Sequence, residues 1–355
     1  MQRRLKIALV VHDLHDHGGH SLYTRMLADE LSQRHAVTVF ANRCERPAAA
    51  AWDVRQVNAW RSSALATVKT FPLGMRTRAK ALAAYDVRHT QGYCGGDPNV
   101  VTAHICVAAY LKSLRGISLR HRLSLRAMAA AEARFYQRYR GPVIAVSRKV
   151  AAELRQFYGV PGDVRVISHG VDAARFNSCN REHFRAAVRT ELAIPADAPI
   201  ALYVGDLTKA HSYLKELSLA APEVQLVVIT SSRAYHWRQP NVRILPATLQ
   251  LERYYAAADA FIFPTTYDAF GMVLLEAMAA GLPVFSSDQA GAAELITHNR
   301  DGFVTTLGEW VDFTATRLRD PASLRPVAIA AEQTAARHPW SAVVSAVEEV
   351  YRAAG

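Results

Sequence analysis

The chain has 355 residues, of which 50% are apolar and 21% charged, and these proportions exclude collagen-like, disordered and coiled-coil proteins. The length suits two domains of about 150–180 residues better than one. The net charge of +11 is unevenly spread, because residues 1–168 carry +15 and residues 169–355 carry −4. A basic half joined to a mildly acidic half indicates that the first half meets an anionic partner.

The beginning of the chain has basic residues followed by a short apolar run over 5–11. The run is too short for a secretory leader, so we expect a first buried strand there. The longest uncharged stretch, 98–111, is shorter than the roughly 20 apolar residues that a membrane-spanning helix needs. The four cysteines contain no C-x-x-C pair, which favours a reducing compartment over a zinc or redox site. We therefore expect a cytoplasmic protein, attached at most to the inner face of the cell membrane.

Short β-branched runs alternate with longer amphipathic stretches along the whole chain. Near-continuous apolar strands between helices are typical of parallel sheets covered on both faces, so the pattern predicts an α/β protein with two doubly wound, Rossmann-like domains. We expect the domains over 1–170 and 171–338 and an amphipathic helix over 339–355. The predicted strands are 6–11, 37–41, 100–104, 143–147 and 164–168, then 200–205, 225–230, 242–245, 260–263 and 283–287.

The loop after the first predicted strand contains Gly18-Gly19, which opens an amphipathic helix. Glycine lets the backbone approach a ligand closely, and the helix N-terminus suits a phosphate or carboxylate. The loop lacks the G-x-G-x-x-G pattern, which disfavours an NAD-linked oxidoreductase. Its histidines and aspartates allow a metal site, but direct contacts with a polar substrate are favoured; these residues are His12, Asp13, His15, Asp16, His17 and His20.

Two segments of the first half, 60–80 and 110–140, interleave basic with apolar side chains. The second carries eight Lys and Arg against one acid. A solvated helix face explains such a pattern, and so does a surface that lies on anionic lipid head groups. Nucleic acid is the competing partner, but no nucleic-acid motif accompanies the charge, so we expect none.

The segment 264–288 carries the most informative spacing. Asp268 precedes a predicted helix and Glu276 lies about a turn and a half inside it, so both are near its positive end. A helix N-terminus with small residues suits a phosphate, and a carboxylate beside it suits sugar hydroxyls. The alternative is a buried glutamate satisfied by the backbone.

At these residues the sequence resembles the family 4 retaining glycosyltransferases of GT-B fold, whose E-x7-E signature is similar to Asp268-x7-Glu276 with FG, EAMAAGLPV and the later GAAELI and DGF. The resemblance extends to HGGHSLYTRMLADELSQRHAVTVFA, VIAVSRKVAAEL, VISHGVDAARF, YVGDLTKA and the final Trp–Tyr helix. It implies two Rossmann-like domains facing across a cleft, an acceptor side in the first and a nucleotide-sugar site in the second. It also implies that the final helix crosses back to the first domain.

The resemblance further implies roles for individual residues. Glu276 would bind the ribose hydroxyls, and Lys209 would neutralise the diphosphate leaving group. Asp268 would hold the donor sugar and its phosphate together with the backbone of Phe270, Gly271 and Met272. His104 would face the donor sugar and act with Lys209 and Asp268 in catalysis. Near the diphosphate and the acceptor the family has a glycine loop, matched here by Gly18 and Gly19, with His17 and His20 on the acceptor side.

Two positions depart from the family pattern. The first motif acid is Asp268 rather than glutamate, and Asp206 stands where the family usually has an arginine. A diphosphate clamp normally uses Arg and Lys together, and Lys209 alone is weaker, so Arg233 or Lys215 is a candidate to contribute beside it.

The expected reaction moves a hexose from a nucleotide-diphosphate sugar, a UDP-sugar rather than GDP-mannose, to a glycan or glycolipid hydroxyl with retention. The absence of a D-x-D motif favours catalysis without a metal or other cofactor. A lipid-linked or lipopolysaccharide acceptor would suit the basic half. The alternatives are a sugar-nucleotide epimerase of the same architecture and a non-catalytic nucleotide-sugar-binding partner. Loops at 230–237 and 245–249 are expected around the nucleotide base.

Overall fold

The computed structural model describes residues 3–15, 18–45, 47, 49–232, 237 and 239–354. The chain forms two compact units, one from Met1–His169 together with Trp340–Gly355 and the other from Gly170–Pro339. Each unit is built around a parallel sheet, and the two are described separately.

The sheet of the first unit has the strand order β5-β3-β1-β6-β7-β8-β9. Neighbouring strands are parallel throughout this order. The strands are β1 (Lys6–Val10), β3 (Ala36–Ala41), β5 (Asp53–Gln56), β6 (Val87–Gln91), β7 (Val100–Ala103), β8 (Val143–Ala145) and β9 (Val164–Val166). A short parallel pair joins β2 (Asp13–Leu14) to β4 (Arg43–Cys44).

Helices connect these strands, and the helix that ends the described chain, α13 (Trp340–Ala354), packs in the same unit. The Tyr351 hydroxyl is 2.7 Å from Nδ1 of His89, and Oε1 of Glu348 is 3.0 Å from Nε2 of His35. These buried hydrogen bonds fix α13 against β6 and against the end of α1. The other helices of the unit are α1 (Gly19–Ser32), α2 (Ala64–Arg76), α3 (Ala79–Leu82), α4 (Val107–Ser113), α5 (Leu119–Arg138) and α6 (Arg148–Tyr158).

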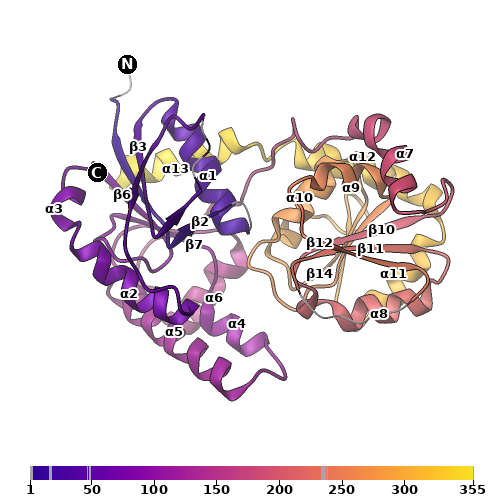
Figure 1. The fold of residues 1–355 in the computed structure, drawn as a ribbon, viewed down its shortest axis with the longest axis horizontal. Helices are drawn as coiled ribbons and strands as arrows, with labels where there is room; N and C mark the ends of the chain where they lie inside the picture. Colours follow the sequence, from indigo (N-terminus) through magenta and orange to yellow (C-terminus); the bar gives the residue numbers. More distant parts are fainter. Residues whose placement is uncertain are drawn as a thin grey trace. The chain divides into compact units, whose positions relative to one another are not determined.

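The sheet of the second unit has the order β12-β11-β10-β13-β14-β15, again parallel, which is the Rossmann order. Figure 1 shows α8 and α11 on one side of this sheet and α9, α10 and α12 on the other. The strands are β10 (Ile200–Val204), β11 (Gln225–Thr230), β12 (Val242–Pro246), β13 (Ala260–Phe263), β14 (Val284–Ser287) and β15 (Phe303–Thr305). The helices are α7 (Asn180–Glu191), α8 (His211–Ala220), α9 (Leu251–Ala257), α10 (Met272–Ala279), α11 (Trp310–Leu318), α12 (Pro321–Ala335) and the 3-10 turns η1 (Leu207–Lys209) and η2 (Gly291–Leu295).

The strands that the apolar runs predicted are present, and strands such as β10 and β13 are buried along their whole length, because helices cover both faces. Three strands of the two main sheets escaped prediction: β5, β6 and β15. Of these, β6 is buried although its sequence is VRHTQ. Gln91, at its end, belongs to the candidate site of the first unit.

None of the helices in the described part of the chain is both long enough and apolar enough to cross a lipid bilayer.

Candidate active site

The chain order of the strands reverses once in each sheet, between β1 and β6 in the first unit and between β10 and β13 in the second. In open parallel sheets ligands bind outside the carboxyl ends of the strands at this point. In the second unit, residues 205–209 leave the end of β10 and residues 264–271 leave the end of β13. These two segments contain Lys209 and Asp268, two of the residues singled out in the sequence.

Lys209 and Asp268 lie beside each other. Nζ of Lys209 is 3.7 Å from Oδ2 of Asp268, and the two side chains are 20% and 30% exposed. The Thr266 N–H also donates to the Lys209 carbonyl at 3.1 Å, which holds the two segments together. A cation beside a carboxylate provides a charge that stabilises a phosphate and an acceptor for sugar hydroxyls.

The turn before α10 requires a glycine. Gly271 has a φ of 89°, in the left-handed region, and a Cβ there would lie 3.1 Å from Cε1 of Phe263. Oδ1 of Asp268 accepts a hydrogen bond from the Phe270 N–H at 3.2 Å, which fixes the turn. The backbone of Phe270, Gly271 and Met272 is thereby held at the N-terminal end of α10, where the helix dipole favours an anion.

Glu276 lies on α10 and is 6% exposed. The Tyr255 hydroxyl of α9 donates a hydrogen bond to its Oε2 at 3.1 Å. Among the described residues this hydroxyl, rather than a backbone N–H, satisfies the buried carboxyl. Burial raises the pKa of Glu276 to about 7, against the smaller opposing effects of the Tyr255 hydrogen bond and Arg175.

Asp206, the departure from the family pattern, is the N-cap of η1. Its Oδ1 accepts hydrogen bonds from the Thr208 N–H and hydroxyl at 3.0 and 2.8 Å and from the Ser232 hydroxyl at 2.9 Å. Burial alone would raise the pKa of Asp206, but these hydrogen bonds and the charge of Lys209 lower it overall. Asp206 therefore shapes the turn that carries Lys209.

Lys215 and Arg233 are the two bases that could replace the family arginine. Lys215 is exposed on α8. Arg233 lies outside the described residues, as does much of the loop expected around the nucleotide base.

In the first unit, Gly18 has a φ of 95° and is the N-cap of α1, which begins at Gly19. His20 lies in the first turn, with its ring centroid 4.3 Å from that of His104. Burial lowers the pKa of His20 to about 3. His17 lies outside the described residues.

His104 directly follows β7 at the carboxyl end of the sheet. Its ring contacts those of Tyr23 and His169, at centroid distances of 4.8 and 5.8 Å, as well as His20. Burial, followed by the charges of neighbouring histidines, lowers the pKa of His104 well below its ordinary value. The ring is therefore neutral at physiological pH.

The sequence analysis missed Gln91, the last residue of β6, which lies next to β7, the strand that His104 follows. Its Oε1 lies 2.9 Å from Nε2 of His104. The only available signal was the polar pattern RHTQ, which argued against a buried strand rather than for a site.

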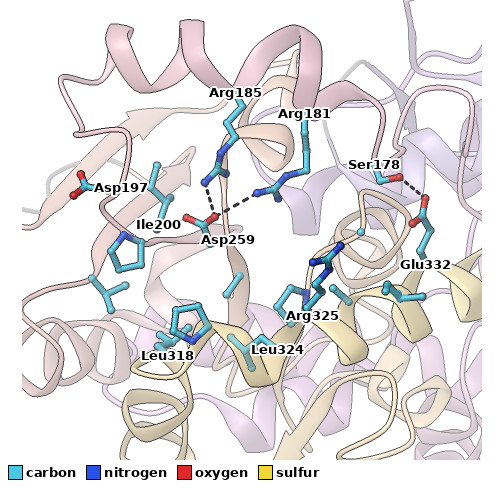
Figure 2. A pocket seen from close by; sticks show the side chains of 18 residues that line it. Ser178, Arg181, Arg185, Asp197, Ile200, Asp259, Leu318, Leu324, Arg325 and Glu332 are labelled. Atoms are coloured by element: carbon cyan, nitrogen blue, oxygen red, sulfur yellow. Dashed lines mark hydrogen bonds and ion pairs between the residues drawn. The ribbon is translucent and has the colours of Figure 1, made fainter.

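A cavity of about 640 Å³ lies at the opposite, amino-terminal edge of the second sheet, where Ile200 begins β10 and Ala260 begins β13 (Figure 2). Figure 2 shows the guanidinium groups of Arg181 and Arg185 directed at Asp259. Both arginines also donate to the Ala258 carbonyl. These contacts attach α7 to the C-terminal end of α9. We therefore infer that the two arginines stabilise the packing of these helices rather than bind a ligand.

Comparisons with known proteins agree on the class of this chain. The model of Glycosyltransferase Family 4 matches residues 17–175, and that of Glycosyl transferases group 1 matches residues 198–319. D-inositol 3-phosphate glycosyltransferase 2 of Catenulispora acidiphila is 29% identical over 239 residues, which are 59% of this chain and 55% of that protein. A glycosyltransferase of Methanocaldococcus jannaschii is 28% identical over 242 residues, 61% of each chain. The chain spans about half the length of the curated relatives it matches.

Solved structures share the whole architecture. WaaG, a glycosyltransferase involved in lipopolysaccharide biosynthesis, has a TM-score of 0.83 at 20% identity, covering 97% of this chain and 99% of its own. Sucrose-phosphate synthase of Thermosynechococcus elongatus has a TM-score of 0.80 at 21% identity and 98% coverage of both chains. Anabaena HepE, solved with UDP-glucose, has a TM-score of 0.73 at 18% identity, covering 99% of this chain and 100% of its own. The chain belongs to the family 4 glycosyltransferases and has the GT-B fold of two Rossmann-like domains.

Proposed function

We propose that this protein transfers a hexose from a nucleotide-diphosphate sugar to a hydroxyl of a glycan or glycolipid, with retention at the anomeric carbon. The observation that carries the proposal is the Lys209–Asp268 pair, 3.7 Å apart at the sheet edge where ligands bind in this fold. Lys209 neutralises the departing diphosphate, and Asp268 accepts hydrogen bonds from the sugar. The backbone at Gly271 and the N-terminal end of α10 support the phosphates.

Glu276 accepts hydrogen bonds from the two ribose hydroxyls of the donor. A carboxylate suits this task because it offers two acceptor oxygens, and Tyr255 leaves lone pairs on both of them available. A UDP-sugar is the favoured donor. The solved complexes of HepE with UDP-glucose and with UDP support this choice, because that protein shares the fold.

The acceptor hydroxyl attacks on the face from which the phosphate leaves, and a phosphate oxygen takes its proton. No metal is needed in this proposal, because Lys209 and the end of α10 supply the charge stabilisation that a cation would otherwise give. Catalysis then rests on positioning and on electrostatic stabilisation of the leaving group.

The acceptor is proposed to be a lipid-linked saccharide or a lipopolysaccharide. The likeness to WaaG, which is involved in lipopolysaccharide biosynthesis, and the basic first half of the chain support this class. Docking at an anionic membrane surface fits the same half, where Trp60, Leu73, Leu119 and Leu123 are exposed among basic residues, Leu119 with 70% of its surface.

Two arms of one experiment test the function. Thermal stabilisation by UDP, GDP and their sugars identifies the donor, because a ligand that binds only the folded protein raises its melting temperature. Release of free nucleotide that depends on an added glycan acceptor then shows transfer. Release of an altered sugar without an acceptor would instead show an epimerase. Binding without turnover would show a non-catalytic nucleotide-sugar-binding partner. Asp206 in place of arginine favours this partner as the second candidate function.

A further inference from the structure

Gln91 and His104 form the most closely defined polar contact of the first unit's candidate site. We propose that Gln91 is a positioning residue that holds His104 as the neutral tautomer protonated at Nε2, so that Nδ1 accepts a hydrogen bond from a sugar hydroxyl. The second half of this statement rests on the proposed function, since it takes a sugar to be the partner of His104. The first half depends only on the contact between the two side chains.

The orientation of the Gln91 amide decides where the proton lies: its oxygen faces the ring, and its nitrogen has no hydrogen-bond partner in the described structure. Oε1 of Gln91 and Nε2 of His104 are 2.9 Å apart. A carboxamide oxygen carries no hydrogen, so the hydrogen in this bond belongs to Nε2. A neutral imidazole has one ring N–H, and Nδ1 therefore keeps its lone pair. Among the described residues, none makes a hydrogen bond with Nδ1 of His104.

The surroundings keep the ring uncharged. The titratable groups that face it are His20 and Tyr23 of α1, His89 of β6 and His169 after β9. Burial lowers the pKa of each of these three histidines to about 3 and raises that of Tyr23 to about 12. All four are neutral between pH 6 and 8, so no counterion among them stabilises an imidazolium at His104.

The main chain of Gln91 is held in the sheet. It is fully buried at the end of β6, paired with Thr102 of β7. Its carbonyl accepts a hydrogen bond from Sγ of Cys94 at 3.1 Å. Gln91 thus contacts Cys94 through its main chain and His104 through its side chain.

A neutral acceptor suits glycosyl transfer. Positive charge develops on the sugar as its bond to the leaving group breaks. An imidazolium next to the sugar would oppose that charge, whereas a neutral Nδ1 orients a hydroxyl without opposing it. A glutamate at position 91 would also fix the tautomer, but its charge would favour the imidazolium.

The tautomer is measured directly by long-range ¹H–¹⁵N correlation spectra of the histidine-labelled full chain, with the His104 signals assigned from their loss in His104→Asn. We expect a protonated Nε2 and an unprotonated Nδ1 between pH 6 and 8. Gln91→Leu should give a mixture of tautomers, and Gln91→Glu should keep Nε2 protonated while raising the pKa of His104. Thr90→Val is the matched control, because Thr90 is the neighbouring buried residue of β6 and its hydroxyl has no partner in the described structure.

A protonated Nδ1 in the wild type, or a Gln91→Leu spectrum identical to the wild type, would overturn the proposal. If Gln91→Leu does not fold, the pKa of His104 in Gln91→Glu decides, because an unchanged value means that residue 91 does not contact Nε2.

In turnover assays Gln91→Leu should lower kcat/KM about tenfold, and Thr90→Val should not. His104→Asn, which keeps an acceptor near Nδ1, should retain more activity than His104→Phe. Absence of turnover with every nucleotide sugar would contradict the proposed function. The NMR spectra would still test the tautomer of His104, because they do not depend on turnover.

Discussion

The Tyr255 hydroxyl donates to Oε2 of Glu276 across 3.1 Å, and this buried contact joins α9 to α10 in the second unit. It has a consequence for nucleotide binding, because the pKa of Glu276 is raised to about 7 by burial. A protonated carboxyl loses one of its acceptor oxygens, and a ribose offers two hydroxyl donors. The ionisation of one side chain thus links pH to donor affinity.

The affinity for UDP should rise with pH. At pH 6 about a tenth of the Glu276 side chains are ionised, so the affinity should be roughly tenfold lower than at pH 8. Titration calorimetry across this range provides the measurement. Glu276→Gln removes this ionisation and serves as the baseline for the titration of the phosphate itself. An identical pH profile in the variant and the wild type would exclude the ribose role.

Tyr255→Phe should shift that profile to higher pH, because it removes the hydrogen bond that lowers the pKa of Glu276. We expect a loss of UDP affinity of about five- to tenfold at pH 7, most of it recovered by pH 8.5. Tyr254→Phe, the neighbouring substitution on α9, is the matched control. A uniform loss at every pH would mean that Tyr255 acts by packing alone.

Lys209→Ala should lower kcat by roughly 10²–10³-fold and change KM much less, since the charge is needed most when the diphosphate departs. Lys209→Arg should recover part of the rate. Lys215→Ala tests the second base: a loss of kcat like that of Lys209→Ala would assign Lys215 to the diphosphate clamp, and unchanged kinetics would exclude it. Steady-state kinetics of the three variants separate the two parameters, and an effect on KM alone would assign Lys209 to ground-state binding.

Turnover should persist in excess chelator, because the proposed charge stabilisation comes from Lys209 and α10. The comparison is the initial rate with and without EDTA, followed by re-addition of magnesium or manganese. A rate that falls with chelator and returns with the metal would contradict metal-independent catalysis.

The stability of the first unit should fall as pH rises, because of Glu132. This buried carboxylate accepts hydrogen bonds from Tyr158 and from the Val107 N–H, yet burial raises its pKa to about 7. Below about pH 4.5 both folded and unfolded chains hold the proton, and between there and pH 7 only the folded chain does, so stability is lost across that window. Glu132→Gln should gain melting temperature relative to the wild type between pH 5 and 8. A pH-independent difference would refute this account.

Binding to anionic liposomes should weaken steeply with salt, since each basic residue near the surface contributes about 1 kcal/mol. Leu119→Ser with Leu123→Ser should weaken it further by removing exposed apolar contacts. Flotation at several salt concentrations tests both effects. Binding that does not change with salt, or no binding to anionic vesicles, would contradict docking of the first half at an anionic membrane surface.

The sequence predicted those parts of the fold in which pattern and burial agree. The apolar runs of β10, β11 and β13 identify buried strands because helices cover both faces of a parallel sheet. The helical spacing of apolar residues also predicted the terminal helix. The residues with this spacing are all buried: Trp340, Val344, Val347 and Tyr351.

The remainder depends on partners distant in sequence. β6 escaped because its buried side chains are polar, and such side chains are tolerated only with hydrogen-bond partners from other strands and helices. For His89 these are Thr102 and Tyr351, the second of them 262 residues away. Likewise, the spacing of Asp268 and Glu276 was visible, but Tyr255 as the partner of Glu276 was not.

The bond between Tyr351 and His89 also bears on how the chain folds during synthesis. The second unit is one continuous stretch, Gly170–Pro339, whereas the first combines the beginning of the chain with Trp340–Gly355. The ribosome therefore releases every residue of the second unit before it releases the helix that completes the first. Until that helix emerges, the polar centre of β6 lacks one of its buried partners, and the newly made first unit stays incomplete while the whole second unit is translated.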